Sequence, residues 1–326
     1  MPPSFSKVVI ILLNWNGKKE TLSCLESLQQ LSYPNFEIVL VDNGSKDNSV
    51  EVISSCFQNI TILETGENLG FAEGNNVGIR HALQQDARYL LLLNNDTTVD
   101  PGLIEGFLEG VDAGGDILGA KLYLHSKPDT FDHFGGNWNP KLAAFDLVGC
   151  REKEDGCSWE HPFEIDYACG CALFIKREVF EKTGFFDPRF FLIWEEADFC
   201  FRAKKQGFKV MISPQAKVWH KVSASFVGGG PHLAYFWWRN RFLWIERNCQ
   251  KKERLALIFR IIFPELFHHL KLWILKSCRI TFLTREKSKQ RAQKQIKRKA
   301  ALVGMRDYLL RRFGNGPSWL YTIREK

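Results

Sequence analysis

Long hydrophobic runs are missing from this sequence. A bilayer span needs about 20 predominantly apolar residues, and the nearest candidate, residues 255–275, is interrupted by three charged side chains. The apolar run at 8–13 leads directly into Asn14 and lacks the small-residue cleavage site of a secretory signal. We therefore expect a cytoplasmic protein without a membrane-spanning helix.

Paired cysteine motifs and two common phosphate-binding motifs are also missing. The nine cysteines are scattered and never spaced as C-x-x-C, which is typical of reduced thiols and argues against a disulfide framework or a zinc ribbon. Neither G-x-x-x-x-G-K-[ST] nor G-x-G-x-x-G follows the first apolar run. The sequence therefore argues against a P-loop and weakens the case for a dinucleotide enzyme.

Positive charge is concentrated near one end of the chain. The 326 residues carry a net charge of +7, but residues 276–312 alone hold thirteen lysines and arginines against two acidic residues. The first 275 residues are mildly acidic by comparison. A basic segment beside the amphipathic, aromatic stretch 255–275 favours an anionic membrane surface or nucleic acid, and a solvated helix face is the simpler alternative.

Apolar runs alternate with amphipathic segments in the first third of the chain. Continuous apolar runs predict buried strands, and the intervening 3.6-residue periodicity predicts helices. This alternation indicates an α/β fold with a parallel, doubly wound sheet. Asp100 and Pro101 are expected to open the helix after the fourth strand, as N-cap and first helical residue. The expected strands are 8–13, 36–41, 60–63 and 89–93, and the expected helices are 18–30, 48–56 and 71–85.

Polar clusters follow three of these strands, at 14–16, 42–45 and 94–96. In such sheets ligands bind beyond the carboxyl ends of the strands. We therefore expect the three clusters to face one crevice. From about residue 116 the pattern becomes mixed, and from about residue 232 it is helical.

The motifs, taken in order, resemble glycosyltransferase family two. The donor half of the family is matched by Asn14-Trp15-Asn16-Gly17, Val41-Asp42-Asn43-Gly44-Ser45, the stretch 68–78 and Leu93-Asn94-Asn95-Asp96. The acceptor half is matched by Gly184-Phe185-Phe186-Asp187, Trp194-Glu195-Glu196-Ala197-Asp198, Val218-Trp219-His220 and Arg239-Asn240. Rhamnosyltransferase-like enzymes of bacterial surface polysaccharides are the most similar members.

The resemblance implies a GT-A fold in three parts. Residues 1–115 would form a Rossmann-like half that binds the sugar nucleotide, and residues 116–250 a mixed-sheet half that binds the acceptor and carries the catalytic residues. Residues 251–326 would form a basic, helical C-terminal extension. The implied reaction is inverting transfer to a glycan or lipid-linked acceptor. The implied donor is dTDP-rhamnose, with UDP-N-acetylglucosamine or another hexose donor as alternatives.

Residues expected to bind the donor come from the motifs of the first half, with one from a later helix. Asp42 is an acceptor-only carboxylate that can receive a hydrogen bond from a pyrimidine N–H or a ribose hydroxyl; the alternative is a turn-forming role. The complete expected set is Asn14, Trp15, Asn16, Asp42, Asn68, Gly70, Asn75, Asn94, Asn95 and Arg239.

A divalent metal, Mg²⁺ or Mn²⁺, is expected to neutralise the diphosphate. Asp96 and His220 stand where the family has its metal or diphosphate contacts. Asn94 occupies the place of a first acid, so only Asp96 offers a charged ligand in that motif.

The acidic cluster at 195–198 is expected to supply the general base. Inversion by a single displacement requires a group that takes the acceptor's proton. Glu196 is the first choice and Glu195 the second, while Asp198 has an i,i+4 partner in Arg202 and reads as an orienting residue. Phe191 and Trp194 could stack on the acceptor's ring, or simply pack in the core.

Two other functions are compatible with parts of the sequence. A sugar nucleotidyltransferase would share the α/β fold but should carry a glycine-rich phosphate loop. A nucleic-acid-binding protein would use the basic segment but leaves the acidic cluster unexplained. We therefore expect no nucleic acid partner, and a peripheral position at the inner face of the cell membrane, reached through residues 255–312.

Overall fold

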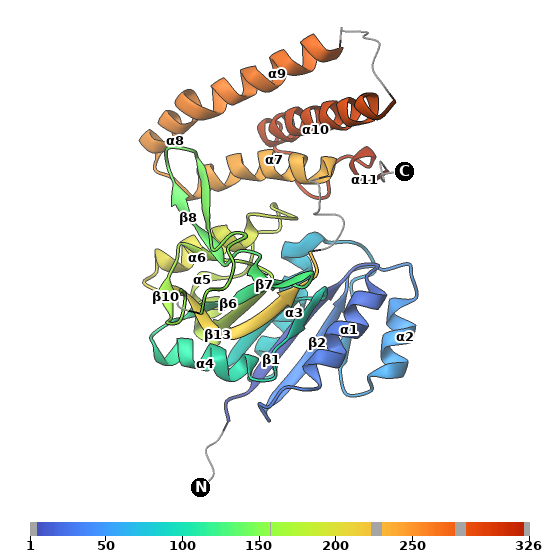
Figure 1. Cartoon of the computed structure of the whole chain (residues 1–326), viewed down its shortest axis with the longest axis vertical. Coiled ribbons are helices and arrows are strands. Elements are labelled where there is room, and N and C mark those ends of the chain that lie inside the picture. The colour runs from blue at the N-terminus through green and yellow to red at the C-terminus, as the bar shows by residue number, and fades with distance from the viewer. Residues whose placement is uncertain (1–4, 157, 223–229, 278–284, 323–326) are drawn as a thin grey trace. The chain divides into compact units, whose positions relative to one another are not determined.

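The computed structural model describes residues 5–156, 158–222, 230–277 and 285–322 (Figure 1). The chain forms two compact units. Unit 1 comprises residues 1–137, 146–188 and 195–222, and unit 2 comprises 138–145, 189–194 and 223–326. No helix within the described ranges is both long and apolar enough to cross a membrane.

Unit 1 is built on a ten-stranded mixed sheet. Its parallel part confirms the expected alternation: β1 lies between β2 and β4, and β3 adds outside β2. The apolar runs of β1, β2 and β4 are buried, as predicted for strands covered on both faces, whereas the edge strand β3 is partly exposed. These strands are β1 (Val8–Asn14), β2 (Phe36–Asp42), β3 (Thr61–Glu64) and β4 (Tyr89–Asn94).

The other side of the sheet becomes mixed, as the resemblance implied. The strand β12 pairs antiparallel with both β4 and β6, and β13 then pairs parallel with β6 and antiparallel with β5 and β10. The strand β7 adds to β6. The bounds are β5 (Thr97–Val99), β6 (Ile117–Leu124), β7 (Lys127–Phe131), β10 (Phe163–Glu164), β12 (Ala172–Lys176) and β13 (Val210–His220).

The helices of unit 1 largely match the expected ranges, with one correction. The helix α4 begins at Leu103, not at Pro101, and its N-cap is Gly102. Asp100 accepts a hydrogen bond from the Gly102 amide at 2.9 Å, so Asp100 and Pro101 form a turn that precedes the helix. The helices are α1 (Lys18–Leu28), α2 (Ser49–Cys56), α3 (Gly70–Gln84), α4 (Leu103–Asp112), α5 (Arg177–Thr183) and α6 (Glu195–Lys204).

Unit 2 is mainly helical. The helix α10 packs along α7, where the Tyr235 hydroxyl donates to Asp307 at 2.9 Å and the Tyr308 hydroxyl donates to Glu246 at 2.6 Å. The helix α7 therefore groups with the later helices, although the functional division predicted from the sequence placed it in the acceptor half. The elements are α7 (Pro231–Asn248), α8 (Lys251–Leu257), the π-helix η1 (Ile258–Ile262), α9 (Phe263–Ser277), α10 (Arg285–Leu309) and α11 (Trp319–Thr322).

A small sheet of order β11-β8-β9 completes the fold. Its strands are β8 (Gly135–Asn139), β9 (Ala144–Val148) and β11 (Tyr167–Ala168). The residues at the tip of its β8–β9 hairpin, 138–145, belong to unit 2.

The contact between α4 and β13 allows no side chain at Gly106. A Cβ atom there would lie 2.5 Å from the Ala216 amide nitrogen and 2.6 Å from the Gln215 carbonyl oxygen. Gly106→Ala should therefore lower the free energy of unfolding by about 1–3 kcal/mol, although alanine is otherwise the better helix former. Glu109→Ala on the exposed side of the same helix should change stability by less than about 0.5 kcal/mol. Urea denaturation of the two variants tests this difference.

Candidate active site

The carboxyl ends of β1, β2 and β4 bring the three polar clusters together, as predicted. The strands end in register, with Asn14 opposite Asp42 and Leu13 opposite Asn94. The Asn14 side-chain nitrogen donates to Asp42 at 2.8 Å, and the Asn95 side-chain nitrogen donates to the Asn14 side-chain oxygen at 3.2 Å. Asn14 is fully buried and lies at the centre of this network. Its role is therefore to hold Asp42 and Asn95 in place.

Asp42 is fixed from two sides. One carboxylate oxygen accepts the Asn14 amide, and the other accepts the Ser45 backbone amide at 2.9 Å. Ser45 also receives the Asn16 backbone amide at 2.9 Å, so the loop after β1 is joined to the loop after β2. Trp15, between them, is 48% exposed, which leaves its ring surface available to a flat ligand.

Asn43, which belongs to the motif after β2 but was not among the expected binding residues, holds the next donor motif. Its side-chain oxygen accepts the Leu69 amide at 2.9 Å, and its side-chain nitrogen donates to Asn68 and to the Gly70 carbonyl at 3.2 and 3.1 Å. Asn68 and Gly70 are thereby fixed beside β2. Asn75 instead donates to the Phe71 carbonyl within α3 and is buried, which indicates a structural role.

His220 lies between two carboxylates at the end of β13. Its Nε2 is 3.3 Å from Asp96 Oδ1, and its Nδ1 is 2.8 Å from Asp132 Oδ2. Burial lowers the pKa of His220, but its contacts with Cys171, Asp132 and Asp96 outweigh burial and raise that pKa above its ordinary value. Asp96 and His220, which are far apart in sequence, are therefore direct neighbours.

Asp132 is a site residue that the sequence analysis missed. It follows β7 in the pair Asp132-His133, and only the fold shows that it reaches His220. A metal-binding histidine commonly places its second ring nitrogen against a carboxylate, which orients the ring. The Asp96–His220–Asp132 array has that arrangement. Its residues fit a divalent cation at Asp96, and His220 Nε2 could ligate that cation only after losing the proton that its raised pKa retains.

The protein supplies only part of a metal coordination shell. Within the described residues, no group of three histidine, cysteine or acidic side chains is placed to hold a metal ion by itself. Asp96 and His220 would therefore need oxygen ligands from a diphosphate and water to complete the shell.

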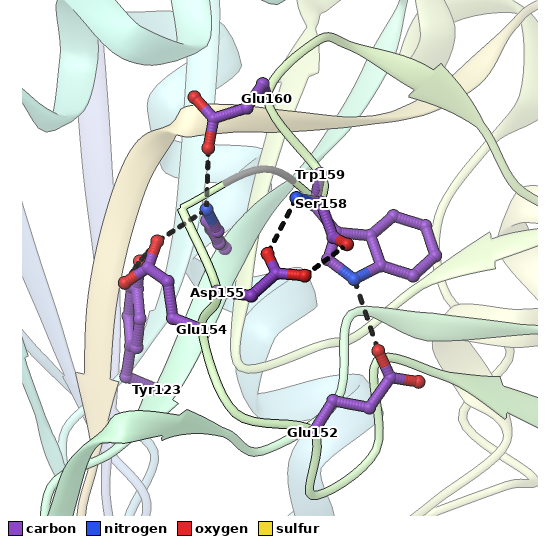
Figure 2. A network of polar contacts seen from close by, with 8 residues as sticks. Tyr123, Glu152, Glu154, Asp155, Ser158, Trp159 and Glu160 are labelled. Atoms are coloured by element: carbon purple, nitrogen blue, oxygen red, sulfur yellow. Dashed lines mark hydrogen bonds and ion pairs between the residues drawn. The ribbon is translucent and has the colours of Figure 1, made fainter.

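The loop that reaches Asp132 is itself held by a polar network, shown in Figure 2. Arg151 on this loop lies 3.2 Å from Asp132 Oδ1. Three residues along, Glu154 accepts hydrogen bonds from the buried Lys121 at 2.7 Å and from Tyr123 at 2.8 Å, both on β6. Further contacts within the loop link Asp155 with Ser158 and Glu152 with Trp159. The loop is thereby fixed to the sheet that carries the site.

The three acids at the start of α6 differ in their surroundings. Asp198 is fully buried and accepts Arg202 Nε at 2.8 Å, which confirms the expected i,i+4 pair. Arg202 continues to the carbonyls of Thr183 and Phe185 at 2.7 and 2.6 Å. Asp198 therefore fixes the helix to the preceding loop.

Within the part of the chain that the structure describes, neither Glu195 nor Glu196 forms an ion pair like that of Asp198 with Arg202. Each has one buried carboxylate oxygen that receives no hydrogen bond. Burial raises the pKa of Glu196, and burial together with the Glu196 carboxylate raises the pKa of Glu195 well above its ordinary value. A buried carboxylate with a raised pKa and an open acceptor position is suited to take a proton.

His133 connects the acidic cluster to the Asp96–His220–Asp132 array. Burial lowers the pKa of His133, while the carboxylates of Asp132 and Glu196 oppose that change. The same histidine responds to the charge on His220. The candidate base and the candidate metal ligands therefore lie in one electrostatic neighbourhood within unit 1.

The segment before the acidic cluster belongs to unit 2 and has a strained backbone. Phe191, Ile193 and Trp194 have φ angles of 63°, 60° and 77°, which non-glycine residues rarely adopt. The Asn240 amide donates to the carbonyls of Phe190, Leu192 and Ile193, each at 2.8 Å. These bonds hold the turn at 189–194.

Arg239 has the same structural role, which differs from the donor contact expected from the sequence. Its guanidinium is fully buried and donates to the carbonyls of Arg189, Phe190 and Gly314 at 3.0, 2.8 and 2.6 Å. Main-chain carbonyls in a buried turn need donors, and Arg239 supplies them.

The two aromatic residues expected to contact the acceptor are mostly covered. The Phe191 ring stacks on Phe236 with centroids 5.4 Å apart, and the Trp194 ring meets Trp244 at 5.9 Å. Each is 7% exposed. Of the two alternatives left open by the sequence, these contacts favour core packing.

Comparison with known proteins identifies the family. Residues 8–184 match the family described as Glycosyl transferase family 2. The chain belongs to this family. It is therefore a glycosyltransferase that acts on sugar-nucleotide donors in glycan synthesis. The nucleotidyltransferase alternative is not supported.

Relatives of known activity include two rhamnosyltransferases. The dTDP-rhamnosyl transferase RfbF of Shigella flexneri is 23% identical over 251 residues, which cover 74% of this chain and 81% of RfbF. The N-acetylglucosaminyl-diphospho-decaprenol L-rhamnosyltransferase of Mycobacterium tuberculosis is 25% identical over 266 residues, covering 69% and 84%.

Solved structures show that the fold is GT-A. The mannosyltransferase PcManGT from Pyrobaculum calidifontis, in complex with GDP-Man and Mn²⁺, has a TM-score of 0.55 at 14% identity, covering 94% of this chain and 89% of that one. S. aureus TarS 1–349 in complex with UDP has a TM-score of 0.53 at 14% identity, covering 93% and 91%.

The raised pKa of Glu196 predicts opposite effects of one substitution on stability and on activity. As pH rises above the ordinary glutamate range, the unfolded chain loses this proton before the folded chain does, so folding stability falls. Glu196→Gln cannot ionise and should therefore be more stable than the wild type at pH 8. Its turnover should fall by about 10²–10⁴-fold, as for loss of a general base.

Thermal unfolding at pH 5 and pH 8, with turnover measured in parallel, tests this expectation. Asp198→Asn is the matched control, and it should be destabilised by roughly 2 kcal/mol because Arg202 loses a charged partner. A Glu196→Gln variant that is less stable than the wild type at pH 8 would contradict the assignment.

The turn at 189–194 predicts a large effect at Asn240. Asn240→Leu keeps the volume but removes the side-chain donor of the Leu192 and Ile193 carbonyls, while Phe190 keeps Arg239, so unfolding free energy should fall by about 3 kcal/mol. Lys252→Ala, at an exposed position of the next helix, should change the unfolding free energy by less than about 0.5 kcal/mol. Chemical denaturation compares the two.

Proposed function

We propose that this chain is an inverting hexosyltransferase that transfers rhamnose from dTDP-rhamnose to a hydroxyl of a glycan or lipid-linked acceptor. The observation that carries the proposal is the Asp96–His220–Asp132 array, in which His220 lies 3.3 Å from Asp96 and 2.8 Å from Asp132. The charges of Glu196, Asp132 and His220 all act on the half-buried His133, which supports a short separation between the candidate base and this array. A base and a diphosphate-binding array are needed side by side when a sugar moves from a diphosphate to a hydroxyl.

Donor binding is proposed at the ends of β1, β2 and β4. Asp42 would accept hydrogen bonds from the base or ribose, with Trp15 offering its exposed ring and Asn16 its loop. Asn68, Gly70, Asn94 and Asn95 would provide amides along the nucleotide. Asn14 acts through Asp42 and Asn95, since its own polar atoms are occupied by the protein.

The diphosphate is proposed to lie at Asp96 and His220. Bound there, Mg²⁺ or Mn²⁺ would neutralise charge on the leaving diphosphate. Asp132 holds His220 Nδ1 and so directs Nε2 toward Asp96. Arg151 in turn partners Asp132.

The acceptor proton is proposed to pass to Glu196. Its carboxylate oxygen that receives no hydrogen bond would accept the proton of the acceptor hydroxyl. The hydroxyl oxygen would attack the anomeric carbon from the face opposite the diphosphate, and the bond from that carbon to the diphosphate would break. Attack from that face inverts the configuration. The Glu196 carboxylate in turn raises the pKa of its neighbour Glu195, so that Glu196 is the one of the pair that we expect to carry the charge.

The proposed donor sugar, rhamnose, and the proposed polyprenyl-type acceptor are inferred from the relatives. One relative is named for dTDP-rhamnose and another for a diphospho-decaprenol acceptor. We accordingly propose a position at the inner face of the cell membrane, where such an acceptor would be found.

Asp96→Asn should abolish most of the turnover while leaving folding intact, because the diphosphate would lose the only charged ligand proposed in its motif. The assay is release of nucleoside diphosphate from a panel containing dTDP-rhamnose, UDP-N-acetylglucosamine and GDP-mannose, with Mn²⁺ or EDTA. We expect dTDP-rhamnose to be used best and EDTA to inhibit. Full activity of the variant in EDTA would overturn the metal assignment, and a preference for another donor would overturn the rhamnose assignment alone. Asp100→Asn, in the turn before α4, serves as the control.

A further inference from the structure

An exposed apolar stripe runs along the helical stretch of α8, η1 and α9 in unit 2. Its members recur every three or four residues, so they lie on one side of the helix. Each is between 37% and 68% exposed, which is unusual for six large apolar side chains in a row. The members are Leu255, Phe259, Phe263, Phe267, Leu270 and Ile274.

The π-helix η1 keeps this stripe on one side. In a regular α-helix, a repeat of four residues drifts around the axis because each turn takes 3.6 residues. A π turn takes more residues, since its hydrogen bonds span i to i+5. Leu257 and Ile262 are five residues apart and both buried, as expected if the turn between them returns to the same side. The inserted turn therefore offsets the drift of the positions 255, 259 and 263.

Cations border the stripe. Lys251, Lys252, Arg260 and Lys271 are exposed on the same helical stretch. The next helix, α10, lies beside α9, where Gln295 donates to the Trp273 carbonyl at 3.3 Å. Figure 1 shows α10 between α7 and α9. The segment 276–312, which contains α10, has thirteen basic residues against two acidic ones.

We propose that this stripe and its bordering cations form a docking surface for an anionic lipid bilayer. The helix would lie in the plane of the interface, with the phenylalanines among the acyl chains and the lysines and arginines at the headgroups. The role of this surface, which is to bring the enzyme to a lipid-linked acceptor, rests on the proposed function, whereas the surface itself does not.

Charge distinguishes the bilayer from two other occupants. A second copy of this chain would bring another strongly basic helix against the first, and like charges oppose that contact. A nucleic acid would pair with the cations but would leave six exposed apolar side chains in water. An anionic bilayer satisfies both the apolar stripe and its cationic border.

The test is co-sedimentation of the full chain with vesicles of phosphatidylcholine alone or of equal parts phosphatidylcholine and phosphatidylglycerol. The wild type should bind the anionic vesicles and not the neutral ones, and added salt should weaken binding. Phe259→Ser/Phe267→Ser should lower the partition coefficient by at least about tenfold. Lys251→Gln/Lys252→Gln/Lys271→Gln should also lower it and should reduce the salt dependence.

Leu147→Ser is the matched control, because Leu147 is equally exposed but lies on β9, away from the stripe in sequence. It should bind as the wild type does. Release of nucleoside diphosphate in solution should be unchanged in all these variants, so failure of the surface and failure of the transferase proposal are distinguishable.

Absence of binding by the wild type, or equal binding to both vesicles, would overturn the surface, and so would unchanged binding by the phenylalanine variant. A phenylalanine variant that changes only the oligomeric state in analytical ultracentrifugation would assign the stripe to self-association instead. A lysine variant that loses only RNA binding would assign the cations to nucleic acid.

Discussion

The register of three parallel strands is the constraint on which the site depends. Because β1, β2 and β4 are aligned so that Asn14 lies opposite Asp42, and Leu13 opposite Asn94, their polar extensions emerge at one edge. A shift of one residue would turn Asn14 away from Asp42. Because these runs are apolar on both faces, alternation does not distinguish one register from the next, whereas the Asn14–Asp42 and Asn95–Asn14 hydrogen bonds favour the observed register and set the position of Asp42.

The carboxylates at this site differ in their hydrogen-bond and ion-pair partners. Asp198 has a guanidinium partner, Asp42 has amide donors, and Asp132 has both a histidine and an arginine. Glu195 and Glu196 each keep a buried oxygen without a donor. Burying a carboxylate oxygen without a hydrogen-bond donor costs free energy, and carboxylates with pKa values perturbed in this way cluster at functional sites. The difference among these acids supports assigning the proton transfer to the 195–196 pair.

Local sequence patterns predicted the elements whose signals are local. The strands at 8–13 and 89–93 and the helices between them follow from hydrophobic periodicity, and the polar clusters follow from their place after those strands. The GT-A fold and the enzyme class came from motif order. Asp132 and Asn43 could not be identified in this way, because their importance lies in contacts made by distant segments.

Arg239 and the aromatic residues show the converse limit. Motif resemblance marked Arg239, Phe191 and Trp194, yet it could not say whether they contact ligands or the chain itself. The strained turn at 189–194 leaves main-chain carbonyls that need hydrogen-bond donors from other parts of the chain, and only the three-dimensional structure shows that Arg239 and Asn240 supply them. Helix α4 shows a smaller limit, since the Asp100-Pro101 pair is equally suited to a turn and to a helix start.

The route of the chain has a consequence for how such enzymes can be recombined. Unit 2 is assembled from the hairpin tip 138–145, the turn 189–194 and the C-terminal helices, so the backbone passes between the units five times. If only the C-terminal helices were exchanged between relatives, the turn 189–194 would stay with the original protein. Its carbonyls would then face the residues that replace Arg239 and Asn240 in the other protein. Productive chimaeras must therefore exchange all three segments together. Natural substitutions in the helices must likewise remain compatible with a six-residue turn that directly precedes the candidate catalytic glutamates in the sequence.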